Sequence, residues 1–170
     1  MRDEIIPWAV GEVDLGDDVL EIGPGYGATT DVFASLLPKM TSVEIDRELA
    51  ARLRARYDGT HVDVVEGDAT QLAFSDERFS AALCFSMLHH VPSATLQDRL
   101  FAEVARVLRR GAPFIATDGL ESEGVRTFHA GDTYQPIDPS TLEARLNAAG
   151  LRDVDVRLNE YGWTALARRM

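Results

Sequence analysis

Apolar residues in this chain gather in short runs that alternate with stretches of helical periodicity. Five runs are strand candidates, at 18–23, 40–45, 61–66, 79–86 and 112–118. Strands that alternate with helices in this way predict an α/β fold with a mostly parallel sheet. Two further runs, 153–158 and 162–168, lie too close together for a helix between them, so we expect an antiparallel hairpin there.

Three of the intervening stretches are predicted to be helices. In 47–57 and in 94–109 an apolar residue recurs every fourth position, and Gly111 follows the second stretch as a stop signal. The stripes consist of Leu49, Leu53 and Tyr57 in the first helix and of Leu96, Leu100, Val104 and Leu108 in the second. A third helix is predicted over 139–149, where Ser140 and Glu143 have the spacing of a capping box.

The segment 119–138 has no clear periodicity. Loops of this length in a compact domain tend to be lids or binding loops. The segment contains His129 and Tyr134, which are candidates for contact with a substrate. Four acids lie in or beside it, namely Asp118, Glu121, Glu123 and Asp132. Such an acidic mouth would suit an amine-bearing or neutral small molecule.

The composition is that of an ordinary globular protein, with 45% hydrophobic and 26% charged residues, and residues 1–170 are expected to form one domain. The first residues lack the basic and apolar regions of a secretory signal, and no run approaches the ~18 apolar residues of a membrane span. We therefore expect a cytoplasmic protein with no membrane association. Cys84 is the only cysteine, which excludes an internal disulfide and a multi-cysteine metal site, and no metal is expected.

The net charge is −11, and the acids are spread along the whole chain. Proteins that bind nucleic acids neutralise phosphates with clustered Lys and Arg, so this charge argues against a nucleic-acid partner. A local basic strip could still outweigh the overall sign.

The stretch VLEIGPGYGATT, residues 19–30, places three glycines between a predicted strand and a helix-like segment. Glycine lets the backbone turn sharply and approach a ligand closely. Two cofactors fit the spacing. Gly23, Gly25 and Ala28 match the dinucleotide fingerprint, whereas Gly23, Gly25 and Gly27 match the glycine loop of an S-adenosylmethionine (SAM) site.

Acidic residues after the next two strands help to separate these alternatives. Glu44 ends the second strand, where a carboxylate can accept both hydroxyls of a ribose, and Asp46 is expected to cap the following helix. Asp68 follows the third strand, where a carboxylate can accept the adenine amine, which is more typical of SAM sites than of NAD sites. A single-domain dehydrogenase would also need a Tyr-x-x-x-Lys pair. The only lysine, Lys39, is preceded at that distance by Ser35, so SAM is favoured.

Taken together, these motifs resemble those of the class I SAM-dependent methyltransferases, and most closely the type 11 methyltransferase domain group, which includes ubiquinone- and menaquinone-pathway methyltransferases. The matching pieces are VLEIGPGYG, VEID, EGDATQLAF, FSMLHHV, EVARVLRRGAPFIATD and LEARLNAAGLRDVDV, in family order from about residue 17 to the end. The resemblance implies a Rossmann-like, doubly wound seven-stranded sheet in the order 3-2-1-4-5-7-6, with the seventh strand antiparallel.

The resemblance also implies which residues contact SAM. The glycines would pass beneath its methionine and ribose, and Glu44 would take the ribose. The other expected contacts are Glu21 near the amino end, Ile45 on adenine, Asp68 with Ala69 at the adenine edge, and Cys84 with Phe85, just past the fourth strand, beside the sulfonium. No catalytic residue is implied. His89 and His90, at the carboxyl edge of the sheet, are candidates for a general base or for shaping the turn before residue 94.

Three functions are compatible with these features. The first is methyl transfer from SAM to a small molecule, and the second is a catalytically silent module that binds SAM or a partner. The third is an enzyme like the ribosomal RNA adenine dimethylases, whose Asn-x-Pro-Tyr type motif is replaced here by Cys84-Phe85-Ser86-Met87. About 16 residues precede the first strand, so substrate cover would come from 119–138 or a partner subunit, and a homodimer is left open.

Overall fold

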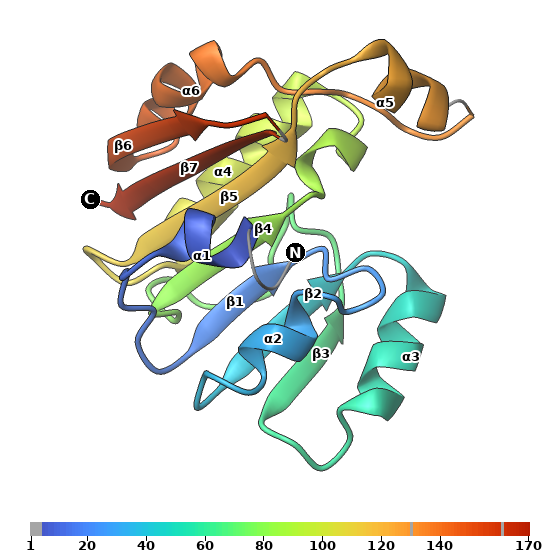
Figure 1. Cartoon of the computed structure of the whole chain (residues 1–170). Helices are drawn as coiled ribbons and strands as arrows, with labels where there is room; N and C mark the ends of the chain where they lie inside the picture. Colours follow the sequence, from blue (N-terminus) through green and yellow to red (C-terminus); the bar gives the residue numbers. More distant parts are fainter. Residues whose placement is uncertain (1–4, 130, 161) are drawn as a thin grey trace.

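The computed structural model describes residues 5–129, 131–160 and 162–170. Its centre is a seven-stranded sheet in the order β3-β2-β1-β4-β5-β7-β6 (Figure 1). The strands are β1 Val19–Ile22, β2 Met40–Glu44, β3 Val62–Glu66, β4 Ala81–Phe85, β5 Pro113–Gly119, β6 Leu151–Leu158 and β7 Gly162–Arg169. The first five pair in parallel, and β7 is antiparallel to both β5 and β6. The predicted fold class and strand order are confirmed.

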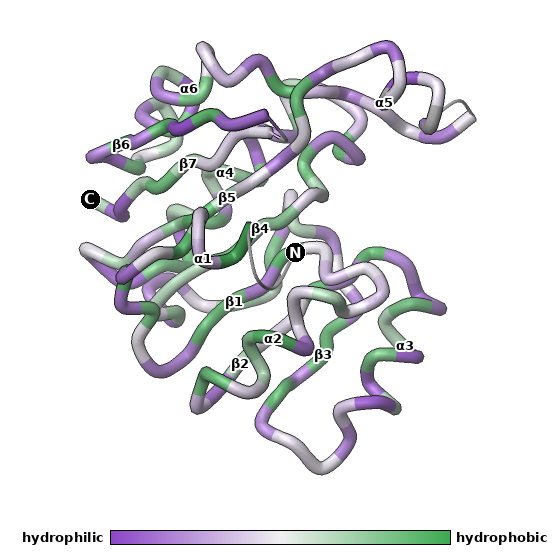
Figure 2. The backbone as a smooth tube through the Cα atoms, in the orientation of Figure 1, coloured by the Kyte–Doolittle hydropathy of each residue, from purple (hydrophilic) through white to green (hydrophobic). Residues whose placement is uncertain are grey.

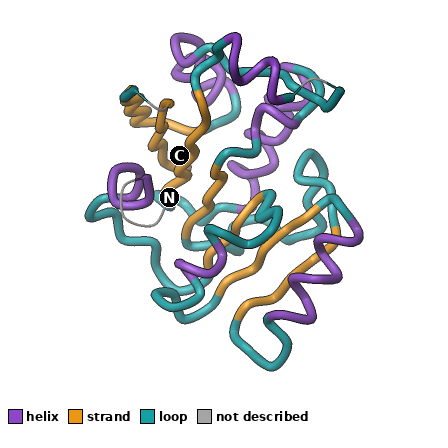
Figure 3. The backbone as a smooth tube through the Cα atoms, turned by 45° about the vertical axis from the view of Figure 1, so that its right-hand side comes forward, coloured by secondary structure: helices purple, strands orange, loops and turns teal. Residues whose placement is uncertain are grey.

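Helices cover both faces of the sheet (Figure 3). They are α1 Ile5–Val10, α2 Thr30–Phe33, α3 Arg47–Arg56, α4 Ala94–Val107, α5 Glu123–Phe128 and α6 Leu142–Ala148, with 3₁₀ turns η1 Leu88–His90 and η2 Pro139–Thr141. One buried cluster joins α4 and α6 to the sheet, and a second joins α1, α2 and α3 to it. The central strands β1 and β4 are buried at every residue, and hydrophobic residues make up much of both (Figure 2). Within the described residues, no helix is both long and apolar enough to cross a membrane.

Side-chain caps fix where the helices begin. The Asp46 carboxylate accepts the N–H groups of Glu48 and Leu49, so the predicted cap of α3 is confirmed. The capping box predicted at Ser140 and Glu143 is wrong. The Asp138 carboxylate accepts both the N–H and the hydroxyl of Ser140, because the chain first forms η2 and enters α6 already in a helical conformation.

Two other boundaries differ from the prediction. The segment expected to lack structure, 119–138, contains α5, which spans only six residues and so shows too few turns for a visible apolar stripe. Strand β6 begins at Leu151, before the predicted 153–158, because a bulge between Arg152 and Asp155 breaks the alternation of apolar and polar residues.

Candidate functional site

The glycine turn connects β1 to α2 at the carboxyl edge of the parallel strands. The φ angles of Gly23, Gly25 and Gly27 are +64°, +55° and +85°, in the left-handed region that other residues rarely adopt. At Gly23 a Cβ atom would also lie 2.1 Å from Cγ of Met87, whose side chain packs directly over the turn. Glycine is therefore required at residue 23 by both its backbone conformation and its neighbour.

Glu44 holds the turn in place from the end of β2. Its side chain is buried, and Oε2 accepts the Gly25 N–H at 2.9 Å while Oε1 accepts the Asp46 N–H at 2.9 Å. One carboxylate thus ties the glycine turn to the start of α3. Each carboxylate oxygen can accept a second hydrogen bond, so these contacts leave acceptor capacity at both oxygens.

Residues after β2 and β3 lie beside each other, because Glu44 and Glu66 are partners in the parallel register. Ile45 is 70% exposed and presents an apolar side chain at this edge. Asp68 is exposed, and its Oδ1 accepts the Thr70 N–H at 2.8 Å. Ala69 packs against the core. An apolar surface and a carboxylate therefore share this edge with the glycine turn.

Glu21 lies in the middle of the sheet, beneath the turn. It is 2% exposed, and its Oε2 accepts the hydroxyls of Thr30 at 2.7 Å and Ser42 at 2.6 Å. Its Oε1 is buried without a hydrogen-bond partner among the described residues. Burial raises the pKa of this carboxyl to about 7, against the opposing effect of the hydroxyls of Ser42, Thr30 and Thr29.

The fourth strand ends later than the resemblance implied. Cys84 and Phe85 are the last two residues of β4 rather than residues just past it, and both side chains are buried. Cys84 belongs to the core under α4, where burial raises the pKa of its thiol, and the Phe85 ring packs 6.0 Å from that of Phe33 on the opposite face. The residues that follow the strand are Ser86, with φ of +51°, and Met87.

The two candidate histidines occupy η1, directly after this turn. His89 Nδ1 lies 2.6 Å from Oδ1 of Asp118, and the His89 N–H donates to Oδ2 at 3.0 Å. Asp118 is the penultimate residue of β5, and its side chain is only 4% exposed. The imidazole of His89 is thus fixed by a buried carboxylate. His90 is more exposed, and its pKa is lowered by partial burial and by the neighbouring His89.

The segment after β5 brings two further rings to the histidines. α5 lies beyond the carboxyl end of β5 (Figure 1), and the chain that follows returns to η1, where the Gln135 N–H donates to the His89 carbonyl at 2.7 Å. His129 stacks on Tyr134 with ring centroids 4.9 Å apart and lies 4.9 Å from the ring of His89. The sequence indicated His129 and Tyr134 as candidates for contact with a substrate, but not that their rings lie beside His89.

The expected acidic mouth is largely engaged in contacts within the chain. Asp118 faces His89, and Glu121 forms an ion pair with Arg126. Asp132 Oδ2 lies 3.6 Å from His90 Nδ1. Asp118 is thus committed to His89, whereas Glu121, Glu123 and Asp132 remain exposed, and a preference for an amine-bearing substrate stays a prediction.

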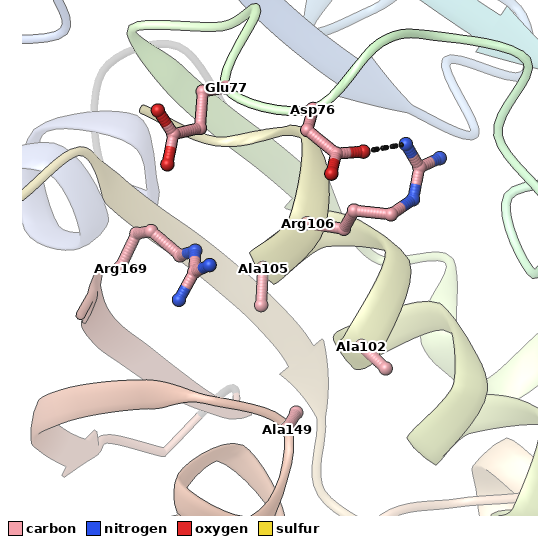
Figure 4. A pocket seen from close by; sticks show the side chains of 7 residues that line it. All are labelled: Asp76, Glu77, Ala102, Ala105, Arg106, Ala149 and Arg169. Carbon is pink, nitrogen blue, oxygen red and sulfur yellow. Dashed lines mark hydrogen bonds and ion pairs between the residues drawn. The ribbon is translucent and has the colours of Figure 1, made fainter. Parts of the chain in front are cut away.

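A hollow of about 190 Å³ lies at the opposite edge of the sheet (Figure 4). It is lined by Asp76, Glu77, Ala102, Ala105, Arg106, Ala149 and Arg169. Arg169 ends β7 next to the start of β5, so this is the amino edge of the parallel strands. Arg106 is already bonded to Asp76 there at 2.8 Å. Open α/β sheets bind ligands at the carboxyl edge, and the hollow is not a candidate site.

Comparison with known proteins identifies a matching family and several similar proteins. The model of the type 11 family, described as "Methyltransferase domain", matches residues 20–116. Among curated proteins, the chain is similar to ribosomal RNA small subunit methyltransferase A of Cupriavidus pinatubonensis, with 49% identity over 74 residues. That match covers 42% of this chain and 26% of the relative, so the chain spans about a quarter of that protein's length.

Two solved structures resemble almost the whole chain. Phosphoethanolamine N-methyltransferase 2 of Haemonchus contortus, in complex with S-adenosyl-L-methionine, has 16% identity and a TM-score of 0.76, covering 97% of this chain and 51% of its own. The YcgJ protein of Bacillus subtilis has 17% identity and a TM-score of 0.74, covering 97% of this chain and 96% of its own. At these identities the likeness is one of fold.

Proposed function

Because the chain belongs to the type 11 methyltransferase domain family, we propose that it transfers a methyl group from SAM to a small molecule. The observation that carries this proposal is the grouping of the glycine turn, Glu44 and Asp68 at the ends of three neighbouring strands. Ligands of open α/β sheets bind at this edge. A methyltransferase neighbour with bound S-adenosyl-L-methionine has the same fold.

The residues at this edge fit the parts of SAM. The remaining lone pairs of Glu44 would accept the ribose hydroxyls, and Ile45 with Ala69 would offer apolar surface to adenine. Asp68 uses Oδ1 for Thr70, so its Oδ2 would accept the adenine amine. The backbone of the glycine turn would lie beneath the methionine part. The bound cofactor supplies a methyl group activated by a positively charged sulfur.

The acceptor side of the site begins at Met87 and His89. Met87 lies over Gly23 and would separate the glycine turn from η1, and His89 follows two residues later. Its bond to Asp118 fixes the ring and leaves Nε2 available to accept a proton or bind a metal ion. Orientation of the acceptor by this fixed ring would supply part of the rate, because a displacement reaction depends on a near-attack geometry.

Ribosomal RNA methylation is the second candidate, favoured by the 49% identity to the Cupriavidus enzyme over 74 residues. Two features of this chain oppose it. The net charge of −11 disfavours phosphate contacts, and residues 84–87 read Cys-Phe-Ser-Met where those enzymes hold the target amine. A small-molecule acceptor is therefore the better supported choice.

A methyl-transfer screen with labelled SAM tests these alternatives. We expect label in a low-mass compound when the protein is incubated with a metabolite extract, and none in protein-free ribosomal RNA. Label in the RNA alone would favour the second candidate. Calorimetry with SAM and S-adenosylhomocysteine runs in parallel, since binding without any transfer would indicate a silent module and no binding of either would overturn the proposal.

Replacing Glu44 by alanine should weaken SAM binding at least about tenfold, because hydrogen bonds to a charged group contribute roughly 1.5–3 kcal/mol. The change also frees the Gly25 N–H and loosens the turn. Isothermal titration calorimetry measures the effect. Glu66→Ala is the matched control, since Glu66 is the exposed partner of Glu44 in the β2–β3 register. Equal affinities for the two variants would contradict the ribose contact.

A further inference from the structure

Three of the four histidines of the chain converge at one place. His89 and His90 come from η1. His129 directly follows α5 and lies about 40 residues after them in the sequence. One ring nitrogen from each lies within 4.8 Å of the others. The remaining histidine, His61, lies apart with its Nε2 at 2.8 Å from the Ala34 carbonyl. The convergence is produced by tertiary structure and has no counterpart in the sequence motifs.

A carboxylate lies beside each of these imidazoles. Asp118 Oδ1 lies 2.6 Å from Nδ1 of His89 and is held in the buried end of β5 by the backbone N–H groups of His89 and Gly119. Metal-binding histidines usually donate their second N–H to such a carboxylate, which fixes the ring orientation and makes the other nitrogen a better ligand. Asp132 Oδ2 lies 3.6 Å from His90 Nδ1 and 3.8 Å from His129 Nδ1.

We propose that His89, His90 and His129 bind a divalent transition-metal ion, with Asp132 supplying the fourth ligand. Three imidazoles and one carboxylate suit zinc, which binds histidine nitrogen at about 2.0–2.1 Å in a tetrahedral arrangement. That arrangement holds ligand nitrogens about 3.3 Å apart. The three nitrogens lie within 4.8 Å of one another, and rotation of His90, whose side chain is the most exposed of the three, would shorten the distances to the other two rings.

The ion would lie on the acceptor side of the proposed SAM site, because Met87, which covers Gly23, is two residues from His89. Asp132 is 62% exposed and is the ligand that solvent or an acceptor reaches most readily. The ion would also join η1 to the segment after α5. Metal binding itself does not depend on the proposed methyl transfer, and it can be measured without SAM.

Metal binding is tested on the chain of residues 1–170 after treatment with a chelator and dialysis. Titration with zinc sulfate, followed by elemental analysis, should show one tightly bound zinc ion per chain. Titration with cobalt chloride should give the visible absorption of a tetrahedral cobalt site. Zinc should also protect the 119–135 segment from proteolysis. Less than one ion per chain, or a cobalt spectrum of a six-coordinate aqueous ion, would overturn the proposal.

Variants identify the ligands. His129→Ala and His90→Ala should lose the cobalt absorption, whereas the control His61→Ala should keep it. Asp118→Asn should retain the site with affinity lowered about 10–100-fold, as expected for a residue that positions His89. Circular dichroism verifies folding of each variant. Metal binding that survives in His129→Ala would contradict the assignment.

Calorimetry with SAM on the same wild-type preparation separates this proposal from the proposed function. SAM binding without zinc binding would remove the metal site and leave the methyltransferase proposal intact. Zinc binding without SAM binding would overturn the methyltransferase proposal and leave the metal site intact.

Discussion

Glu21→Gln should raise the free energy of unfolding by about 3 kcal/mol at pH 8 and should change it little near pH 4.5. The reason is the position of this carboxyl beneath the glycine turn, buried and with one oxygen lacking a partner among the described residues. Burial raises its pKa to about 7 from the ordinary 4.5. Glutamine retains an acceptor for the hydroxyls of Thr30 and Ser42 without the option of a buried charge.

The sign of the pH dependence follows from proton binding. Between pH 4.5 and about 7 the folded protein keeps the Glu21 proton while the unfolded chain has lost it, so the folded state binds more protons. The stability contributed by this group is complete below pH 4.5 and is lost as the pH rises through 7. Wild-type stability should therefore fall across this window relative to that of the glutamine variant.

Urea denaturation at several pH values, without SAM, measures the difference between the two proteins. Glu66→Gln serves as the control for the removal of one negative charge from an exposed position. If Glu21→Gln were less stable than the wild type at pH 8, the carboxylate would be stabilising in its charged form, and the explanation by burial would be wrong.

Gly23→Ala should cost about 3 kcal/mol of stability and should also weaken SAM binding. A left-handed conformation costs an ordinary residue roughly 1–2 kcal/mol, and Gly23 has φ of +64°. The new methyl group would lie 2.1 Å from Cγ of Met87. Forcing that side chain aside adds a cost of about 1–3 kcal/mol, typical of overpacking.

Two further variants separate these causes. Gly111→Ala has a similar φ of +76° and no atom within 4 Å of the added Cβ, so it should show the backbone cost alone. Met87→Ala added to Gly23→Ala should remove the steric part of the loss. Chemical denaturation measures the free energy of unfolding of the wild type, of the two single glycine variants and of the double variant. Equal losses in Gly23→Ala and Gly111→Ala would show that Met87 does not press on the turn.

Local chemistry made part of this structure predictable. Asp46 caps α3 because a carboxylate can reach the N–H groups two and three residues ahead, whatever the rest of the fold does. The apolar runs located the strands because burial at every residue of β4 leaves a continuous apolar run, whereas in β3 and β6 buried or half-buried residues alternate with exposed ones. The strand order itself came from the resemblance to a family.

The parts that sequence reasoning missed depend on contacts between distant segments. Asp118 and His89 are 29 residues apart, and their pairing follows from β4 and β5 being neighbours in the sheet. The approach of His129 depends in addition on the path of the segment after α5. Ser140 and Glu143 have the spacing of a capping box, but in the structure the Ser140 N–H donates to the carboxylate of Asp138 instead. Spacing alone does not describe such competition.

The position of β7 affects how the sheet can assemble. β7 is the last strand in the sequence, yet it lies between β5 and β6 and hydrogen-bonds to both (Figure 1). As the chain leaves the ribosome, β5 presents an unpaired edge and β6 has no neighbour until residues 162–169 emerge. An unpaired edge is a site for pairing with other chains. Aggregation during synthesis should therefore be governed by the interval between completion of β5 and emergence of β7.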